Sequence, residues 1–432
     1  MQAAALGAIY QREYETLERH ALEALQLERL QHLVARLRGA NEIYRERLRD
    51  AQVPRSLDEL AALPFTTKSD MRDAYPLGLL AVPERDLARI HASSGTTGNP
   101  TIGAYTGEDL RIFGEVMARS LAGGGIAPGD MFQVAWGYGL FTGGLGAHGG
   151  CEALGACAIP ASSGNTARQV QLLADLPVVG IGATPSYALV LAERFRAEGR
   201  RPKALRYAIC GAEAWTTQMR AALEELWGVT ATNIYGLTEI IGPGVAQECL
   251  AKNGLHVQED HFLAEIVDPQ TNLPVPDGTR GELILTTLTR EAMPVLRYRT
   301  RDLTQITREP CGCGRTTARL DWFTGRVDDM LVIRGVNVFP SAVEHVLLGF
   351  RELAPNYRIF VDRPEHGLDR MLVEVEHAPE ATFGDPQSFR EAVRTRLTET
   401  LLVSLDVSIV APGTIERIEA GKAKRVYDRR SL

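Results

Sequence analysis

The pattern of hydrophobic and polar positions changes along the chain. Residues 12–49 place Leu, Ala and Val at helical spacing among paired charges, which predicts one or two amphipathic helices. From residue 130 to about 240, short apolar runs such as MFQVAW and VVGIGAT alternate with helical runs such as SYALVLAERFRAEG. Strands that alternate with helices are typical of βαβ units, so this region predicts a parallel sheet.

A different pattern begins near residue 250. Period-two segments such as FLAEIV and GELILTTLTR are joined by the turn signals DPQTN and PDGTRG, which predicts an antiparallel, barrel-like segment over about 250–320. The last hundred residues mix strand and helix patterns, as in MLVIRGVNVFP and SAVEHVLLGF. We therefore expect an α/β protein: an N-terminal domain (1–325) of parallel sheets, flanking helices and the barrel-like segment, and a small mobile C-terminal α+β domain (326–432).

Composition narrows the class of protein. A chain of 432 residues exceeds one ordinary core, and 45% apolar with 23% charged residues is typical of globular proteins. A net charge of −7 does not support binding to nucleic acid or to an anionic membrane. Polar residues interrupt every apolar stretch before it reaches the length of a signal core or a membrane span, so we expect a cytoplasmic protein.

The six cysteines fall into two groups, and they are too few for a disulfide framework. Cys151, Cys157 and Cys210 lie in apolar surroundings and are expected to be buried. The other three combine with a histidine in a Cys₃His set that suits tetrahedral zinc: Cys249, His256, Cys311 and Cys313. Four protein ligands close the coordination sphere, so the metal is predicted to be structural.

Two alternatives to this zinc set stay open. His261 is the substitute fourth ligand if His256 points away. The other interpretation is a group of reduced structural thiols, with His256 on the surface. We favour zinc because both the type and the number of ligands fit.

Glycine-rich stretches raise the question of nucleotide binding. Gly144, Gly146 and Gly149 match G-x-G-x-x-G, but no acidic residue lies about 20 positions further on, so chance or close packing is favoured over a dinucleotide turn. The stretch HASSGTTGNPT at residues 91–101 is not a Walker loop, because Asn99 stands where a lysine is needed.

Further polar clusters occur towards the C-terminus. In NIYGLTE a buried strand runs into a turn with Tyr235, Thr238 and Glu239, the place where open α/β sheets bind ligands. Glu239 is a candidate Mg²⁺ ligand beside substrate phosphates. RYRTRD contains Asp302, TGRVDD contains Arg326 and Asp328, and GKAKRV contains Lys422. Each of these alone is more often a solvated surface charge.

Taken in order, the motifs carry a family resemblance over essentially the whole chain. HASSGTTGNPT, GYGLFTGGLGAH, GAEAWT, NIYGLTE, AMPVLRYRTRDL, GRVDDMLVIRGVNVFP and GKAKRV resemble the ANL superfamily of adenylate-forming enzymes, and more narrowly the phenylacetate–coenzyme A ligase family. The resemblance implies that ATP converts a carboxylic acid to an acyl-adenylate, after which the coenzyme A thiol displaces AMP. Such chemistry needs positioning and charge stabilisation rather than a protein nucleophile, and no Ser-His-Asp or Cys-His pair is evident.

The resemblance also implies a set of site residues. The ATP site would comprise Ser93, Ser94, Gly95, Thr96, Thr97, Gly98, Gly211, Ala212, Glu213, Asn233, Tyr235, Thr238, Asp302 and Arg326. Thr238 would contact the α-phosphate, Glu239 would hold Mg²⁺, and Asp302 would bind the ribose with help from Arg326. Lys422 would be the adenylation lysine, with Lys424 as the alternative. Asp328 matches the hinge about which the small domain turns.

The acyl pocket is predicted mainly from the glycine-rich stretch WGYGLFTGGLGAHGG. Its candidates are Trp136, Tyr138, Phe141, Gly149 and Gly236, and aromatic walls suit an aromatic acid. Trp136 and Gly149 stand where similar ligases usually carry tyrosines, and a glycine there would leave room for a bulkier ring such as indoleacetate. Phenylacetate or a substituted benzoate is the alternative.

Other functions remain possible on this resemblance. The acyl group could pass to an amine, a hydroxyl or a carrier protein, or the chain could be a non-catalytic nucleotide-binding relative. The presence of Glu239, Asp302, Arg326 and Lys422 together argues against the last. The resemblance suggests a homodimer, and Asn99 leaves the phosphate loop without a cation of its own.

Overall fold

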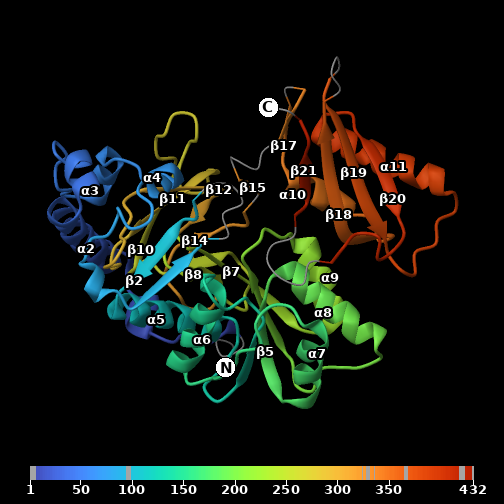
Figure 1. Cartoon of the computed structure of the whole chain (residues 1–432), viewed down its shortest axis with the longest axis horizontal. Helices are drawn as coiled ribbons and strands as arrows, with labels where there is room; N and C mark the ends of the chain where they lie inside the picture. Colours follow the sequence, from blue (N-terminus) through green and yellow to red (C-terminus); the bar gives the residue numbers. More distant parts are fainter. Residues whose placement is uncertain are drawn as a thin grey trace.

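A computed structural model describes residues 6–93, 99–323, 325–326, 331–334, 336–363, 368–417 and 424–430. The predicted loop residues 94–98, the hinge residue Asp328 and the adenylation lysine Lys422 lie outside the described residues. The described chain forms two lobes, with residues up to about 323 in one and residues 331–430 in the other (Figure 1).

The N-terminal segment is helical, as its apolar spacing predicts. Its helices are α1 (Arg12–Glu15), α2 (Arg19–Ala40), α3 (Glu42–Arg47) and α4 (Lys68–Asp73), with short 3-10 turns η2 (Leu57–Ala62) and η3 (Glu84–Asp86). Asn41 ends α2 and caps α3, because its side chain accepts a hydrogen bond from the Tyr44 N–H. Thr67 and Asp70 form a capping box that sets the first residue of α4.

The main sheet has nine strands in the order β13-β14-β9-β8-β7-β6-β5-β3-β4. Its parallel part comprises β3 (Met131–Val134), β4 (Cys157–Ile159), β5 (Val178–Ala183), β6 (Tyr207–Gly211) and β7 (Thr230–Leu237). These are the strands that the alternating pattern predicts. The sheet continues with antiparallel strands: β8 (Gly242–Glu248), β9 (Leu255–Val257), β14 (Arg319–Leu320) and β13 (Ile306–Thr307).

Helices cover both faces of this sheet. The covering helices are α5 (Gly107–Gly123), α6 (Thr142–Leu154), α7 (Thr166–Asp175), α8 (Pro185–Ala197) and α9 (Thr217–Trp227). Apolar residues of α5 and α6 belong to one buried core, and those of α7, α8 and α9 to another, so the two groups lie on opposite faces. Hydrophobic burial against the sheet, rather than helix propensity, holds these short helices in place.

The G-x-G-x-x-G match lies inside α6 and serves helix packing. A Cβ on Gly146 would lie 2.3 Å from the Phe113 ring, and one on Gly150 would lie 2.5 Å from the Met117 side chain, both on α5. The small residues therefore let α5 and α6 approach closely, which confirms the packing interpretation over a dinucleotide turn.

The antiparallel segment predicted over about 250–320 divides between two sheets. The strands β10 (Phe262–Val267), β11 (Gly281–Thr287), β12 (Tyr298–Thr304) and β15 (Gly325–Arg326) form a four-stranded antiparallel sheet. Strands β9, β13 and β14 extend the main sheet instead. A separate pair, β1 (Arg89–Ala92) and β2 (Ile102–Tyr105), flanks the residue 94–98 loop.

The C-terminal lobe has its own buried core. Its elements are β16 (Leu331–Ile333), β17 (Val336–Val338), α10 (Pro340–Leu347), β18 (Leu353–Asp362), β19 (Arg370–His377), α11 (Pro386–Leu401), β20 (Asp406–Val410) and β21 (Val426–Asp428). The sheet order is β20-β19-β18-β21, with antiparallel and parallel pairs mixed. This is the small α+β unit that the sequence predicts.

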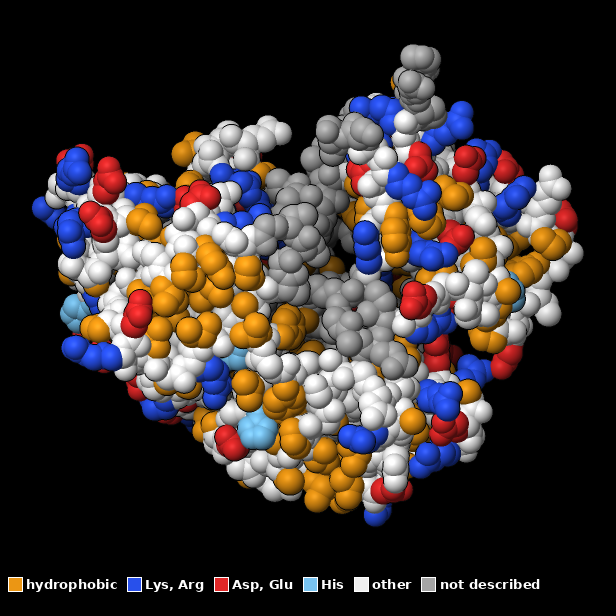
Figure 2. Space-filling model, viewed as in Figure 1, with side chains coloured by type: hydrophobic (Ala, Val, Ile, Leu, Met, Phe, Trp, Pro, Cys, Tyr) orange, Lys and Arg blue, Asp and Glu red, His pale blue; other side chains and the backbone are white. Residues whose placement is uncertain are grey.

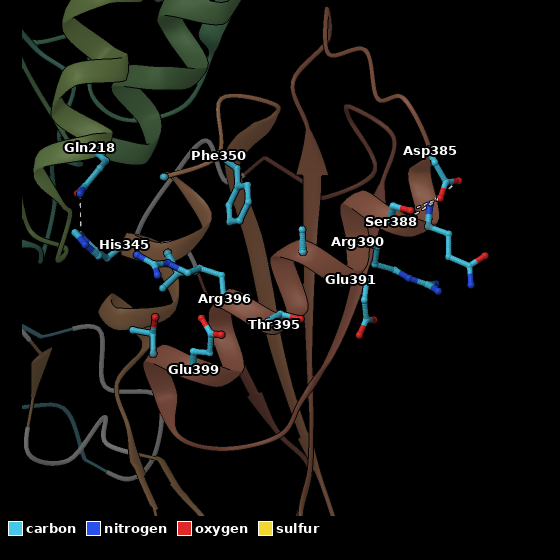
Figure 3. Close-up of a pocket in the computed structure, with 15 residues that line it drawn as sticks. Gln218, His345, Phe350, Asp385, Ser388, Arg390, Glu391, Thr395, Arg396 and Glu399 are labelled. Carbon is cyan, nitrogen blue, oxygen red and sulfur yellow. Dashed lines mark hydrogen bonds between the residues drawn. The ribbon is translucent and has the colours of Figure 1, made fainter.

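The two lobes meet along α8 and α9. Gln218 of α9 lies 2.8 Å from the His345 Nδ1 of α10, as Figure 3 shows at the edge of a hollow of about 1190 Å³ beside α10 and α11. Arg196 pairs with Glu380 at 2.6 Å, and the Glu193–Arg417 pair is 3.5 Å apart. None of the described residues predicted for the active site lines this hollow.

None of the helices in the described parts of the chain is long and apolar enough to cross a membrane. On the face shown in Figure 2, basic and acidic side chains are interspersed over both lobes. This distribution agrees with a chain whose charge gives no support to nucleic-acid binding.

Candidate active site

A cleft of about 1120 Å³ lies between the two lobes, at the carboxyl ends of β6 and β7. Figure 2 shows the notch that separates the lobes. One wall comes from residues 212–216 and the end of β7, together with Asp302 and Arg326. The other wall comes from the C-terminal lobe and includes Tyr357, Lys424 and Arg425. The carboxyl edge of a parallel sheet is where α/β proteins bind ligands.

Asp302 is the centre of a polar cluster in this cleft. It lies on β12 directly across from Arg326 of β15, and the Arg326 Nη1 donates to its carboxylate at 3.1 Å. The Tyr235 hydroxyl donates to the other carboxylate oxygen at 2.5 Å, and the Tyr235 ring stacks on Phe323 with centroids 4.3 Å apart. Burial and the neighbouring Asp302 carboxylate raise the pKa of Tyr235 well above its usual range, so the phenol stays a donor.

The turn after β6 supplies a second part of the cleft. A Cβ on Gly211 would lie 2.3 Å from the Ile234 carbonyl oxygen, so only glycine lets β6 pass this close to β7. Ala212 adopts a positive φ of 74°, and Glu213 turns back to accept a hydrogen bond from the Ser186 N–H at 2.7 Å. These contacts hold the predicted adenine-binding residues in a tight, ordered turn.

Asn233 reaches the cleft from the end of β7. Its backbone N–H donates to the Glu248 carboxylate at 2.7 Å, and Glu248 forms a buried ion pair with Arg220. Asn233 lines the cleft beside Tyr235 and Gly236. The structure thus brings together the predicted nucleotide-site residues of β6, β7 and β12.

Thr238 and Glu239 occupy the turn between β7 and β8, and both are buried. A Cβ on Gly236 would lie 1.9 Å from the Gly242 carbonyl oxygen, so this turn closes only with glycine. A Cβ on Gly103 of β2 would lie 3.0 Å from the Thr238 carbonyl oxygen. The base of the predicted phosphate loop therefore lies against Thr238.

Ser93 is the one predicted phosphate-loop residue that the structure describes. Its N–H donates to the Thr101 carbonyl at 2.9 Å, and the Thr101 N–H donates to the Ser93 Oγ at 3.1 Å. These two hydrogen bonds tie the ends of the loop together. The sequence prediction for residues 94–98 stays a prediction.

Two cations that the motifs did not single out lie at the site. The Lys68 Nζ lies 3.9 Å from the Glu239 carboxylate. Arg425 forms a buried ion pair with Glu344 and lies over the Tyr357 ring at 4.8 Å, and burial lowers the pKa of Arg425. Arg425 follows the predicted Lys424 alternative, so the GKAKRV motif was a signal for it. Lys68 lies in a helical segment without a recognisable motif.

The predicted acyl-pocket residues separate into two groups. A Cβ on Gly143, at the start of α6, would lie 3.2 Å from the Phe141 ring and 3.2 Å from the Trp136 Cβ, whereas the Trp136 ring lies against Gly182 of β5. The Tyr138 ring lies against Gly144, and Gly236 lines the cleft. Gly149 lies about 9 Å from Gly143 along the axis of α6, at about 1.5 Å per residue. Its carbonyl faces Gly114 of α5, whereas a Cβ on Gly149 itself would meet no atom within 4 Å. The neighbouring His148 contacts the Tyr138 hydroxyl at 3.2 Å through its Nδ1.

The candidate metal ligands converge on one point. The ligand atoms of Cys249, His256, Cys311 and Cys313 all lie within 4.8 Å of one another, and all four residues are buried. The Cys313 Sγ lies 3.4 Å from the His256 Nε2, and the Cys249 and Cys311 sulfurs are 3.8 Å apart. Hydrogen bonds from Cys249 and His256 lower the pKa of the Cys313 thiol, which favours the thiolate that binds metal.

The structure decides between the two candidate histidine ligands and corrects the expected burial of one cysteine. His261 is not an alternative ligand, because its ring contacts Thr289 at 2.8 Å and Asp260 at 3.2 Å, away from the cysteines. His256 instead turns its Nδ1 to Thr317 at 3.2 Å, which orients Nε2 towards the thiols. Cys157 is exposed rather than buried, because β4 is the edge strand of the main sheet.

Comparisons with known proteins agree with this geometry. The model described as "AMP-binding enzyme" matches residues 38–288, and "AMP-binding enzyme C-terminal domain" matches residues 335–430. A phenylacetate-coenzyme A ligase of Thermus thermophilus is 50% identical, and the alignment covers 98% of this chain and 100% of that protein. A phenylacetate-coenzyme A ligase of Escherichia coli is 46% identical, with 97% of each chain covered.

Solved structures add information on the arrangement of the lobes. The 2-hydroxyisobutyryl-CoA ligase in the postadenylation state, in complex with R3-HIB-AMP, is 29% identical with a TM-score of 0.90, covering 97% of this chain and 92% of that chain. The same ligase with 2-HIB-AMP and CoA in the thioesterification state is 31% identical, covering 97% of this chain and 92% of that chain, and its TM-score is 0.71. The lobes here are therefore arranged more like the postadenylation structure.

Proposed function

The chain belongs to the phenylacetate–coenzyme A ligase family of AMP-binding enzymes, which are acid–thiol ligases, and we propose that it joins an arylacetate to coenzyme A at the expense of ATP. In the first half-reaction a carboxylate oxygen of the acid attacks the α-phosphorus of ATP, and pyrophosphate leaves with the electron pair of the broken P–O bond. In the second, the coenzyme A sulfur attacks the acyl carbon, AMP leaves, and the thiol proton passes to solvent.

The polar cluster around Asp302 is the observation that carries this proposal. An ionised, largely buried carboxylate with two fixed donors, Tyr235 and Arg326, is suited to accept hydrogen bonds from the vicinal hydroxyls of a ribose. The adjoining turn at Ala212 and Glu213 would receive the adenine. Asn233 and Tyr235 would shape the space between the nucleotide and the acid.

The phosphates would extend towards the turn between β7 and β8. Thr238 would contact the α-phosphate, and the buried Glu239 carboxylate would hold Mg²⁺, which neutralises phosphate charge in the first half-reaction. An acidic oxygen next to the base of the phosphate loop fits a magnesium site that keeps several waters. Lys422 is expected to stabilise charge at the α-phosphate, and Arg326 to orient the nucleotide.

We propose phenylacetate as the acid, in line with the names of the relatives of Thermus thermophilus and Escherichia coli. The Phe141 ring and the Cβ of Trp136 lie beside Gly143 at the start of α6, and aromatic side chains in this segment support an aromatic substrate. The prediction of indoleacetate as a substrate depends on Gly149 leaving space in the acyl pocket. A Cβ on Gly149 would meet no atom within 4 Å, so a bulkier ring such as indoleacetate stays the second candidate acid.

ATP–pyrophosphate exchange tests the first half-reaction. Exchange should depend on phenylacetate and should be faster than with indoleacetate or benzoate, and added coenzyme A should then yield phenylacetyl-CoA and AMP. No exchange with any aryl acid would refute the proposed activity. Exchange without thioester would assign the acyl group to another acceptor.

We further propose that the Cys₃His cluster binds one structural zinc ion. The support is the ligand type, the mutual distances below 4.8 Å and the Thr317 hydroxyl that orients His256. Zinc held there would connect the end of β8, strand β9 and the turn between β13 and β14. Purified protein should contain about one zinc per chain, and less than about half an equivalent would argue against the site.

The expected homodimer stays a prediction from the family resemblance. Light scattering coupled to size-exclusion chromatography would measure it directly. A mass near the 47.3 kDa of one chain would contradict it.

A further inference from the structure

Lys68 lies at the proposed phosphate and magnesium site although it belongs to none of the motifs. It is the first residue of α4, and its Nζ lies 3.9 Å from the Glu239 carboxylate. The Lys68 side chain is 41% exposed, whereas that of Glu239 is 8% exposed. An ion pair at this distance with one exposed partner contributes little to stability, so the position needs another explanation.

The backbone under this lysine is held firmly. The Thr66 N–H donates to the Arg297 carbonyl at 3.1 Å, and the Arg299 N–H donates to the Thr66 carbonyl at 2.9 Å. The segment is thus paired with β12, the strand of the ribose-binding carboxylate. The Thr67–Asp70 capping box then begins α4. Only the flexible lysine stem remains free to reach a ligand.

The predicted phosphate loop lacks a positive charge. Residues 91–101 contain no lysine or arginine. The loop begins at Ser93 and returns through β2, where Gly103 packs against Thr238. Backbone N–H groups and hydroxyls can bind phosphate oxygens, but a charged donor binds them more strongly.

A buried cation at this turn is already engaged. Arg290 is buried and donates to the backbone carbonyls of Glu239, Ile240 and Ala104, so it holds the turn itself. Among the ion pairs of the described residues, the pair with Lys68 is the one that involves Glu239. Lys68 is therefore the described cation best placed for phosphate.

We propose that Lys68 binds the β- and γ-phosphates of ATP, and then the departing pyrophosphate, and so provides from α4 the charge that the loop lacks. This inference rests on the proposed ligase function. With Glu239 engaged by Mg²⁺, the ammonium group turns from the carboxylate to the phosphate oxygens. In this role Lys68 binds phosphate charge and transfers no group.

Phosphate binding by Lys68 predicts different effects of its loss on the two half-reactions. ATP and pyrophosphate carry the groups that Lys68 contacts, whereas AMP and the acyl-adenylate lack them. Lys68 is therefore needed for adenylation and is dispensable for thioester formation from a preformed adenylate. A residue that only supported the fold would affect both.

The test compares Lys68→Ala with Lys68→Arg and with Lys203→Ala. Lys203 is a matched control because its Nζ donates to the Asp175 carbonyl at 3.1 Å and because it does not line the cleft. Lys68→Ala should raise the KM for ATP about tenfold to a hundredfold in phenylacetate-dependent pyrophosphate exchange, the range for a hydrogen bond to a charged group. Lys68→Arg should retain most of the affinity, and Lys203→Ala should match the wild type.

Two further measurements complete the test. Calorimetry should show weaker binding of inorganic pyrophosphate with Mg²⁺ to Lys68→Ala, and unchanged binding of AMP. Transfer from synthetic phenylacetyl-AMP to coenzyme A should keep its wild-type rate. Adding Asn99→Lys to Lys68→Ala should recover ATP affinity, because it returns a cation to the loop.

Several results would overturn the inference. An unchanged KM for ATP would do so, as would equal losses in both half-reactions, which would indicate a structural role. A lower Mg²⁺ requirement with an unchanged KM for ATP would show that Lys68 only neutralises Glu239. If the wild type exchanges with no acid, the ligase proposal fails, and pyrophosphate calorimetry still decides whether Lys68 binds phosphate.

Discussion

At the scale of single residues, Asp302 is already hydrogen bonded before a nucleotide arrives. Tyr235 and Arg326 each donate to one carboxylate oxygen, at 2.5 and 3.1 Å. Because these donors fix the carboxylate, its oxygens are held in set directions. A ribose then binds with little further loss of side-chain entropy.

Replacing Tyr235 by phenylalanine removes one of these donors and keeps the ring stacked on Phe323. We expect Tyr235→Phe to raise the KM for ATP about tenfold, from the loss of one hydrogen bond to a charged group, with little change in melting temperature. Tyr427→Phe is the matched control, since Tyr427 stacks on Phe360 at 5.1 Å in the other lobe. An unchanged KM in Tyr235→Phe would remove this donor from the nucleotide site.

The raised pKa of Tyr235 adds a pH dependence of stability. Burial and the Asp302 carboxylate raise this pKa above the ordinary value of 10.0, so the unfolded chain loses the phenol proton first. The stabilisation is complete below pH 10 and is lost as the pH rises through the folded pKa. Chemical unfolding of the wild type and Tyr235→Phe across pH 9–11 should show a steeper loss for the wild type.

Gly236 is a second position where one atom decides the local structure. A methyl group there would lie 1.9 Å from the Gly242 carbonyl oxygen. The backbone can relieve this clash only by moving the turn that holds Thr238 and Glu239. We expect Gly236→Ala to lower the free energy of unfolding by about 1–3 kcal/mol and to reduce adenylation strongly. Gly39→Ala in α2, where nothing lies within 4 Å of the new methyl group, should leave activity unchanged and stability equal or higher. Urea unfolding and pyrophosphate exchange measure both.

At the scale of elements, the Cys₃His cluster joins strands that are separate in sequence. Cys249 follows β8, His256 lies on β9, and Cys311 and Cys313 lie in the turn between β13 and β14. These short strands form the antiparallel edge of the main sheet, with only two or three residues each in β9, β13 and β14. Strands this short pair weakly on their own, so a cross-link there has a large effect.

Replacing one ligand tests the proposed zinc. Cys313→Ser should lose the metal and lower the free energy of unfolding by on the order of 3 kcal/mol, as for a ligand at a hundred times its dissociation constant. Cys157→Ser is the matched control, because Cys157 is exposed on β4 and outside the cluster. Metal analysis and thermal melts with and without chelator give the measurement. A chelator that destabilises Cys313→Ser as much as the wild type would contradict the site.

At the scale of the whole molecule, contacts between the lobes hold one of several arrangements. The TM-score of 0.90 with a postadenylation structure falls to 0.71 with the thioesterification structure of the same ligase. Among the described residues, the contacts that bridge the lobes include polar pairs such as Arg196–Glu380 at 2.6 Å and the Gln218–His345 contact of Figure 3. Interfaces of this kind allow one lobe to turn against the other.

A charge swap tests whether these contacts favour adenylation. Arg196→Glu should slow pyrophosphate exchange by a few-fold at low salt, since exposed ion pairs contribute about 0–1 kcal/mol, and should spare thioester formation from synthetic phenylacetyl-AMP. Glu380→Arg should behave alike. The double variant Arg196→Glu/Glu380→Arg should recover exchange, and additive losses in the double variant would show that the pair does not act as a contact.

The sequence alone determined the parts of the molecule that depend on neighbouring residues. Hydrophobic spacing is set within a turn of helix or a few strand positions, so the alternating strands and helices and the C-terminal α+β unit were predictable. Long motifs also placed Asp302, Tyr235 and Arg326 in one site. The sequence could not show that the antiparallel segment divides between two sheets. That division depends on which strands, distant in sequence, lie alongside each of its own strands.

Only the tertiary structure decided which distant side chains meet. His256 and His261 are close in sequence and alike in chemistry, and the pairing of β9 with β14 decided that His256 faces the thiols. Lys68 reaches Glu239 because Thr66 is bridged to β12. Gly146 faces Phe113 of α5 because the packing of α5 against α6 needs small residues along that face. In each case the physical reason is the same: local periodicity sets the faces of an element, and only sheet order and packing set what those faces meet.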